Sequence, residues 1–192
     1  GPRDARSGEI PQILFLGRLS ERKGVTDLLR ALADPAMQQL QWAAIFAGDG
    51  PVDGYRRLSA EAGLLHRVEM PGWLSQEEVR QLCRLADILV LPSYAEGLAM
   101  AVMEGLAHGL AVVTTRVGAH EEVITDGETG IFVPVGDPHA LAATLARLII
   151  DRETREFLSL NARAHYLGHF TINAYLRSLE RIYAHARKAG AS

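Results

Sequence analysis

The fold is decided by the stretch Leu89-Val-Leu-Pro-Ser-Tyr-Ala-Glu-Gly-Leu-Ala-Met-Ala-Val-Met-Glu-Gly-Leu-Ala-His-Gly-Leu-Ala-Val-Val-Thr-Thr115. It predicts a buried strand over residues 88–91, a turn with proline, serine and glycine, a helix that opens near Leu98, and a second apolar strand over residues 111–114. A strand, turn, helix and strand in this order are the building block of a parallel sheet.

The same stretch carries two acids and a predicted helix N-terminus. Glu96 lies in the turn and Glu104 in the helix, while the Gly97, Leu98 and Ala99 amides fall where unpaired donors are exposed. These amides suit a phosphate, and the carboxylates suit hydroxyl groups. A helix that begins at Leu98 puts Glu104 about 9 Å along the axis, comparable with the distance from a diphosphate to its ribose. A sugar nucleotide has both chemical features.

Outward from this stretch, strands and helices alternate along the chain. Further strands are predicted over 13–16, 41–47, 68–70 and 131–133, and helices over 25–32, 52–62 and 76–86. Ser75 and Glu78 have capping-box spacing, and Asp137-Pro138 opens another helix. Residues 151–188 predict two helices broken near Gly168. The pattern predicts an α/β fold with a doubly wound, six-stranded parallel sheet, whose ligand would lie at the carboxyl ends of the strands.

Composition limits the class of protein. The 192 residues are 48% hydrophobic and 22% charged with a net charge of −3, which argues against a general nucleic-acid binder, and no apolar run could span a membrane. Cys83 is the sole cysteine, so an internal disulfide is excluded and a cytoplasmic location fits. Helical spacing predicts that its thiol is buried. No cluster has metal-ligand spacing, and the default for His108, His120, His139 and His185 is the surface.

Two further segments frame the domain. Residues 1–10 are interpreted as the remnant of a tag with a flexible leader, and residues 11–192 as one Rossmann-like domain with its C-terminal helices. After the first strand, the loop from Gly17 to Gly24 holds Arg18 and Lys23. A charged loop residue is usually only solvated, but two cations between glycines at the carboxyl edge of a parallel sheet suit an anionic ligand.

In this order, the motifs resemble the C-terminal donor-binding half of the retaining glycosyltransferases of the GT-B fold, family 4. The resemblance covers nearly the whole chain: residues 15–24, 47–51, Pro92-Ser93, the pair Glu96 and Glu104, and residues 126–138. It implies a nucleoside-diphosphate sugar as donor, no metal or other cofactor, and hexosyl transfer with retention. Its catalytic groups would be Arg18, Lys23 and Glu96: the cations, next to Gly17, would hold the diphosphate and Glu96 would contact the sugar.

The resemblance also implies the remaining donor contacts. The Gly97, Leu98 and Ala99 amides would contact sugar and phosphate, Glu104 would accept hydrogen bonds from the ribose, and Trp73-Leu74-Ser75 would lie near the nucleobase. The family commonly has phenylalanine at the position of Leu98 and glycine or proline at that of Ala99. The shape of the sugar pocket should therefore differ from the common one.

The acceptor-binding N-terminal Rossmann domain of such enzymes is not in this chain, which is interpreted as an excised fragment that would bind donor without transferring sugar. That domain is its expected partner and would make any peripheral membrane contact. Two alternatives stay open: half of a nucleotide-sugar isomerase (epimerase), and a non-catalytic module that binds sugar nucleotides. A dinucleotide oxidoreductase fits less well, because no G-x-G-x-x-G follows the first strand.

Overall fold

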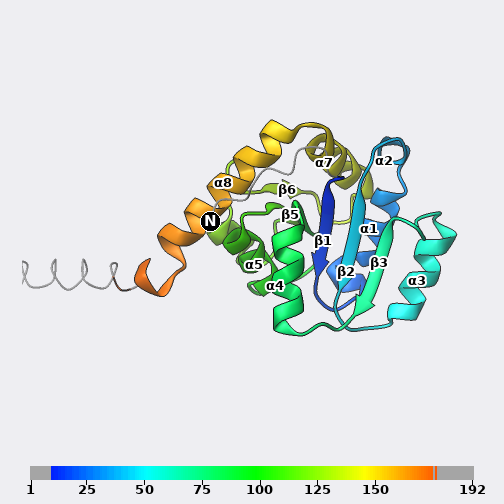
Figure 1. Ribbon diagram of the computed structural model, residues 1–192, viewed down its shortest axis with the longest axis horizontal. Helices are drawn as coiled ribbons and strands as arrows, with labels where there is room; N and C mark the ends of the chain where they lie inside the picture. The colour runs from blue at the N-terminus through cyan, green and yellow to red at the C-terminus, as the bar shows by residue number, and fades with distance from the viewer. Residues whose placement is uncertain (1–9, 175, 177–192) are drawn as a thin grey trace, which may run out of the picture.

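The computed structural model describes residues 10–174 and 176 as an α/β fold built on one six-stranded sheet (Figure 1). All neighbouring strands pair in parallel, in the order β3-β2-β1-β4-β5-β6. This is the predicted doubly wound arrangement. The strands are β1 (Gln12–Leu16), β2 (Ala43–Ala47), β3 (Val68–Gly72), β4 (Ile88–Leu91), β5 (Ala111–Thr115) and β6 (Ile131–Val133).

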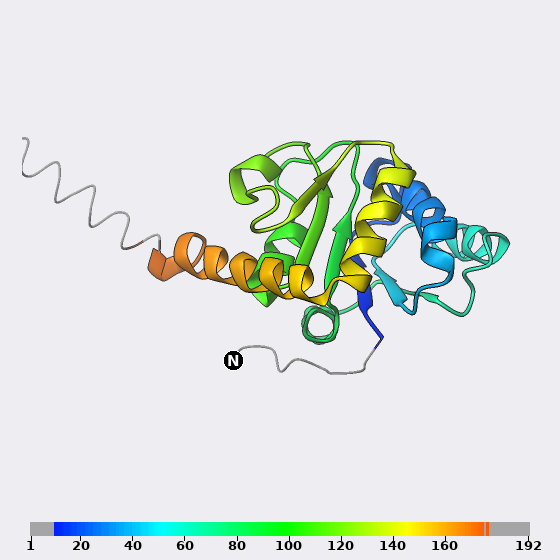
Figure 2. The ribbon, with the colours of Figure 1, turned by 90° about the horizontal axis from the view of Figure 1, so that it is seen from above.

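The central strands are buried because helices cover both faces of the sheet. Every residue of β4 and β5 is buried, as expected of continuous apolar runs in a parallel sheet. One group of helices packs together on one face: α1 (Val25–Leu32), α2 (Pro35–Gln38), α3 (Val52–Glu61) and α7 (Pro138–Ile150). The other face carries α4 (Gln76–Leu85), α5 (Met100–His108) and α8 (Arg152–His169); Figure 2 shows the two groups from above.

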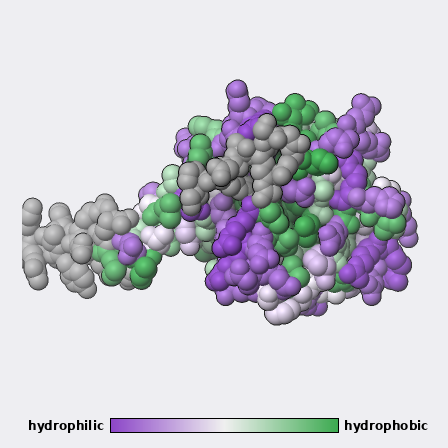
Figure 3. Space-filling view, viewed as in Figure 1, coloured by the Kyte–Doolittle hydropathy of each residue, from purple (hydrophilic) through white to green (hydrophobic). Residues whose placement is uncertain are grey.

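Helix α4 leaves part of the β1–β2 face open. Figure 3 shows apolar surface over these strands between the hydrophilic surfaces of α4 and α3. Gln12, Leu14, Ile45, Leu82 and Leu85 line the hollow there. It lies between α4 and the sheet, away from the loops that follow the carboxyl ends of the strands.

The predicted caps are confirmed. The Ser75 side chain accepts from the Glu78 amide, and the Glu78 carboxylate accepts from the Ser75 amide, which completes the capping box of α4. Asp137 accepts from the Ala140 amide with Pro138 in the first turn of α7. The short helix α2, capped by Asp34, was not predicted, whereas α6 (His120–Val123) lies where the sequence predicts a loop entering a short helix or turn, residues 116–122.

At the ends of the chain, the structure describes only part of the predicted segments. Helix α8 ends at His169, close to the predicted break at Gly168. The predicted leader lies outside the described residues except for Ile10, as does most of the second helix predicted within residues 151–188, which follows the break near Gly168. In residues 10–174 and 176, no helix is both long and apolar enough to cross a bilayer.

Candidate functional site

The order of strands reverses between β1 and β4, which lie side by side with Ile13 opposite Ile88 and Leu14 opposite Leu89. From this pair the chain winds to β2 and β3 in one direction and to β5 and β6 in the other. In open parallel sheets, the crevice outside the carboxyl ends of strands at such a reversal is where ligands bind. The loops that follow β1 and β4 therefore define the candidate site.

These two loops are packed backbone to backbone. Gly24 ends a 3₁₀ turn over Glu21–Lys23 and has φ +70°, and a Cβ there would lie 2.0 Å from the carbonyl oxygen of Pro92. The Tyr94 amide donates to the Arg22 carbonyl at 2.8 Å. Glycine is required at position 24 both for the left-handed conformation and for the close approach. The contact fixes the position of Lys23 relative to the β4–α5 loop.

Lys23 and Glu96 meet across the reversal point. Lys23 Nζ lies 2.6 Å from Glu96 Oε1, and their side chains are only 15% and 6% exposed. Ser93 Oγ donates to the same Oε1 at 2.7 Å. Burial by itself would raise the pKa of Glu96, but hydrogen bonds from Lys23 and Ser93, with the charges of Lys23 and Arg22, outweigh it and hold the pKa below its usual value. The carboxylate is thus ionised at neutral pH.

Residues of β5 and of the loop after it hold the β4–α5 loop, which contains Glu96, through hydrogen bonds. Thr115 Oγ1 donates to the Ser93 carbonyl at 2.6 Å, and the Ala119 amide donates to the Gly97 carbonyl at 2.9 Å. Gly118, with φ +56°, packs so closely that a Cβ would lie 2.1 Å from the Gly97 oxygen. Sequence reasoning assigned no role to Ser93 or Thr115, although Pro92-Ser93 was one of the recognised motifs.

Two more side chains anchor this region. The Tyr94 hydroxyl donates to Asp27 Oδ2 at 2.5 Å, which connects the β4–α5 loop to α1. His120 is fully buried, with Nδ1 at 3.1 Å from Thr114 Oγ1 and 3.0 Å from the Thr115 carbonyl oxygen. The expectation of a surface position is therefore wrong for His120, because α6 folds its first residue onto the end of β5.

The start of α5 differs from the prediction. The helix begins at Met100 with Ala99 as N-cap, two residues later than Leu98. Glu104 is then about 6 Å along the axis from the first helical residue, not 9 Å. Among the described residues, no hydrogen bond engages the amides of Gly97, Leu98 and Ala99, although Gly97 and Leu98 belong to the loop and not to the helix, and Ala99 is only 5% exposed.

The other predicted residues lie around this centre without contacting the Lys23–Glu96 pair. Arg18, directly after Gly17, forms an exposed ion pair with Asp49 of the β2–α3 loop at 2.7 Å. Trp73 follows β3 and is 76% exposed. Leu74 packs partly against the core, and the Ser75 side chain is engaged in the cap of α4. The structure thus brings Gly17, Lys23 and Glu96 together, leaves Arg18 at the exposed rim, and exposes Trp73 after the edge strand β3.

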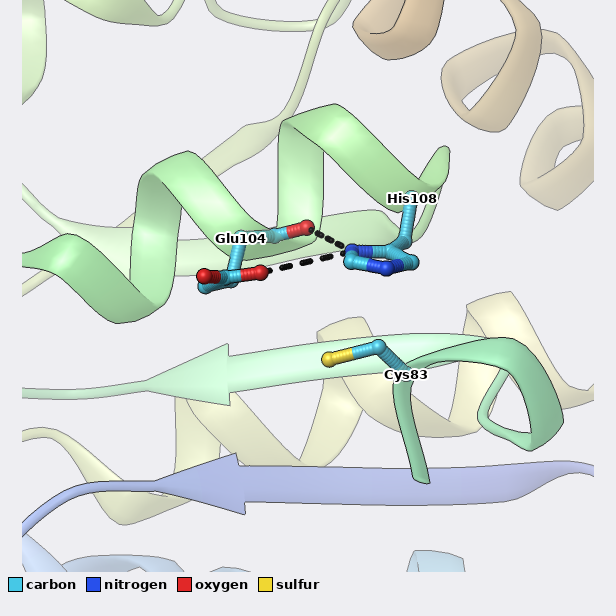
Figure 4. Close-up of side chains that lie close together, drawn as sticks. All are labelled: Cys83, Glu104 and His108. Carbon is cyan, nitrogen blue, oxygen red and sulfur yellow. Dashed lines mark hydrogen bonds and ion pairs between the residues drawn. The ribbon is translucent and has the colours of Figure 1, made fainter. Parts of the chain in front are cut away.

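Glu104 lies on α5 with a partner of its own. Its Oε2 is 3.5 Å from His108 Nδ1, one helical turn later, and the His108 Nδ1 also lies 2.9 Å from the Glu104 carbonyl oxygen. The Cys83 thiol of α4 lies near both residues (Figure 4), and its burial confirms the prediction for the thiol. Ligand atoms of these three residues all lie within 4.8 Å of one another, so folding assembles a cluster that sequence spacing did not indicate.

Comparison with known proteins identifies the class. The family model of the glycosyl transferases group 1 matches residues 3–165, and the chain belongs to this family. It is 34% identical over 179 residues to the D-inositol 3-phosphate glycosyltransferase of Corynebacterium diphtheriae. The matched region covers 90% of this chain but only 42% of that protein. The chain therefore spans less than half the length of this relative.

Solved structures agree on the fold. The C-terminal domain of the group 1 glycosyl transferase LpcC from Francisella tularensis superposes with a TM-score of 0.77 at 26% identity, covering 85% of this chain and 89% of that one. HepE of Anabaena, solved in complex with UDP and glucose, has a TM-score of 0.77 at 23% identity over 90% of this chain and 48% of that one. The resemblance to the C-terminal domain of GT-B glycosyltransferases is thereby confirmed.

Proposed function

We propose that this domain binds the nucleoside-diphosphate sugar of a retaining, hexosyl-transferring glycosyltransferase of the cytoplasm. The observation that carries the proposal is the nearly buried Lys23–Glu96 pair at the reversal point between β1 and β4. A cation and an ionised carboxylate held together there suit a ligand with both anionic and hydroxyl groups. A diphosphate linked to a sugar is such a ligand.

Lys23 is able to serve Glu96 and a phosphate together. Its ammonium group has three N–H donors, and Glu96 Oε1 accepts one of them. A phosphate oxygen would take another, next to the unengaged amides of Gly97, Leu98 and Ala99. Arg18 would reach the diphosphate from the rim after releasing Asp49, at small cost, because the pair is exposed.

The same groups would favour bond cleavage. When the bond between the anomeric carbon and the diphosphate breaks, negative charge grows on the leaving group and positive charge on the sugar. Lys23 and the amides would stabilise the first, and Glu96, which lies between Lys23 and Ser93, would orient the sugar through its hydroxyl groups. Because these groups are fixed by packing before the donor arrives, little reorganisation is needed in the transition state.

Transfer would need the rest of the protein. The chain spans 42% of the Corynebacterium relative, so an N-terminal domain would supply the acceptor site and any contact with a membrane surface. The isolated domain would then bind donor without catalysing transfer. Glu104 would contact the ribose and the Trp73-Leu74-Ser75 segment the nucleobase; both assignments rest on the family resemblance.

Calorimetric titration with UDP and UDP-glucose tests the proposal, since HepE, which shares the fold, was solved with UDP and glucose. Lys23→Met should weaken binding of both ligands, and Glu96→Gln binding of UDP-glucose, each about 10- to 100-fold, the value of one charge-assisted hydrogen bond. Arg152→Met is the control, because Arg152 forms an exposed ion pair with Glu156 on α8. If folded Lys23→Met bound these and other nucleotide sugars as tightly as the unmodified chain, the proposal would be refuted.

A further inference from the structure

The cluster of Cys83, Glu104 and His108 has the geometry of a partly open cup. The thiol is fully buried and comes from α4, while the carboxylate and imidazole come from α5 and are 35% and 22% exposed (Figure 4). Glu104 and His108 stand four residues apart on one helix, which places both side chains on the same face. The cluster therefore has a sulfur donor at its floor and oxygen and nitrogen donors at its mouth.

This donor set suits a zinc-class ion. Zn²⁺ takes thiolate, imidazole and carboxylate ligands in tetrahedral sites with bond lengths of about 2.0–2.3 Å, so neighbouring ligand atoms are roughly 3.3–3.7 Å apart. The Glu104 Oε2 to His108 Nδ1 distance of 3.5 Å already has this value, and all donors lie within 4.8 Å. Mg²⁺ and Ca²⁺ prefer oxygen ligands and would not use the sulfur and nitrogen.

We propose that Cys83, Glu104 and His108 form a binding site for a zinc-class transition-metal ion, with the fourth position open to solvent. The His108 ring would turn away from the Glu104 carbonyl oxygen, 2.9 Å from Nδ1, and the thiol would lose its proton on metal binding. Both changes lower the affinity below that of a preformed site.

The metal ion would also compete with the donor. This second step rests on the proposed function, in which the Glu104 carboxylate accepts hydrogen bonds from the ribose. Coordination to an ion would fix the Glu104 carboxylate and take up part of its hydrogen-bonding capacity, so metal binding would weaken nucleotide binding. The domain would then lose donor affinity when the metal concentration rises.

Titration of the 192-residue chain with Co²⁺ tests the site directly, because a cobalt–thiolate bond gives a charge-transfer band in the near ultraviolet. We expect this band to saturate at one ion per chain and to disappear in Cys83→Ser. In His108→Gln it should need at least tenfold more Co²⁺. His139→Gln is the matched control: His139 is exposed beside Asp34, and its loss should leave the band unchanged.

The outcomes separate the two proposals. Absence of the band, or a band that persists unchanged in both folded Cys83→Ser and His108→Gln, would overturn the metal site. With the site intact, saturating UDP should raise the Co²⁺ concentration at half-saturation. If UDP binds without this shift, the competition is wrong; if UDP and other nucleotides fail to bind the metal-free chain, the proposed function fails while the metal site stands.

Discussion

Replacing Ser93 by alanine tests how the candidate site is held. Ser93 is fully buried and its Oγ donates to the ionised Glu96 carboxylate at 2.7 Å. A hydrogen bond to a charged group contributes about 1.5–3 kcal/mol, and because Glu96 keeps the bond from Lys23, we expect a loss of about 2 kcal/mol in the free energy of unfolding. For a chain of this size, that lowers the melting temperature by about 4–8 °C.

Ser59 provides a matched control of opposite sign. It is also buried, at 2% exposure, but its Oγ has no hydrogen-bond partner in the described part of the chain. Removing an unpaired buried hydroxyl from helix α3 should leave stability unchanged or raise it by up to about 1 kcal/mol. The same chemical change would thus differ by about 2–3 kcal/mol between the two positions.

Urea unfolding followed by circular dichroism measures both variants, with equal m-values as the condition for comparing them. Calorimetry with UDP-glucose should show weaker binding for Ser93→Ala only, since its loss removes a hydrogen bond that holds the Glu96 carboxylate in place. If Ser59→Ala destabilised the domain as much as Ser93→Ala, the hydrogen bond to Glu96 would not explain the effect, and the reasoning would be refuted.

Two other changes test the same loop. Gly118→Ala should lower the free energy of unfolding more than Gly63→Ala. Both glycines have positive φ (+56° and +75°), but only at Gly118 would an added Cβ meet backbone, 2.1 Å from the Gly97 oxygen. Equal losses of stability in urea unfolding would contradict the close approach. Because the folded pKa of Glu96 is lowered, its pairing with Lys23 contributes fully above the unfolded value near 4.5 and is lost as the pH falls through the folded pKa. The stability difference between the unmodified chain and Glu96→Gln should therefore shrink in melting experiments below pH 4.5, and a pH-independent difference would exclude this linkage.

The sheet could be predicted from the sequence because its central strands β4 and β5 are buried along their whole length and consist of nearly continuous apolar runs. Strong caps such as Ser75 with Glu78 marked their helices correctly. The start of α5 was predicted too early because residues with high helix propensity extend back to Leu98. The boundary is set by a contact distant in sequence, in which the Ala119 amide donates to the Gly97 carbonyl, and Ala99 is extended as the N-cap. No local sequence pattern indicates a hydrogen bond between residues so far apart in the chain.

In the candidate site, too, some positions follow from the sequence and others depend on packing between distant elements. Charge and loop position predicted that Arg18, Lys23, Glu96 and Glu104 would surround one groove, because residues after neighbouring parallel strands meet at one edge of the sheet. The structure joins Lys23 with Glu96, while Arg18 pairs with Asp49 and Glu104 with His108. Glu104 and His108 meet because they stand four residues apart on α5, whereas the approach of Cys83 to them depends on how α4 packs against α5, which residue spacing does not indicate. The Glu104 carboxylate thus has two proposed partners, a ribose and a metal ion. The metal ion is suggested only by the packing of α4 against α5. A donor site adjoining a metal-binding cluster on the same helix would let the metal concentration set donor affinity without any change in the fold.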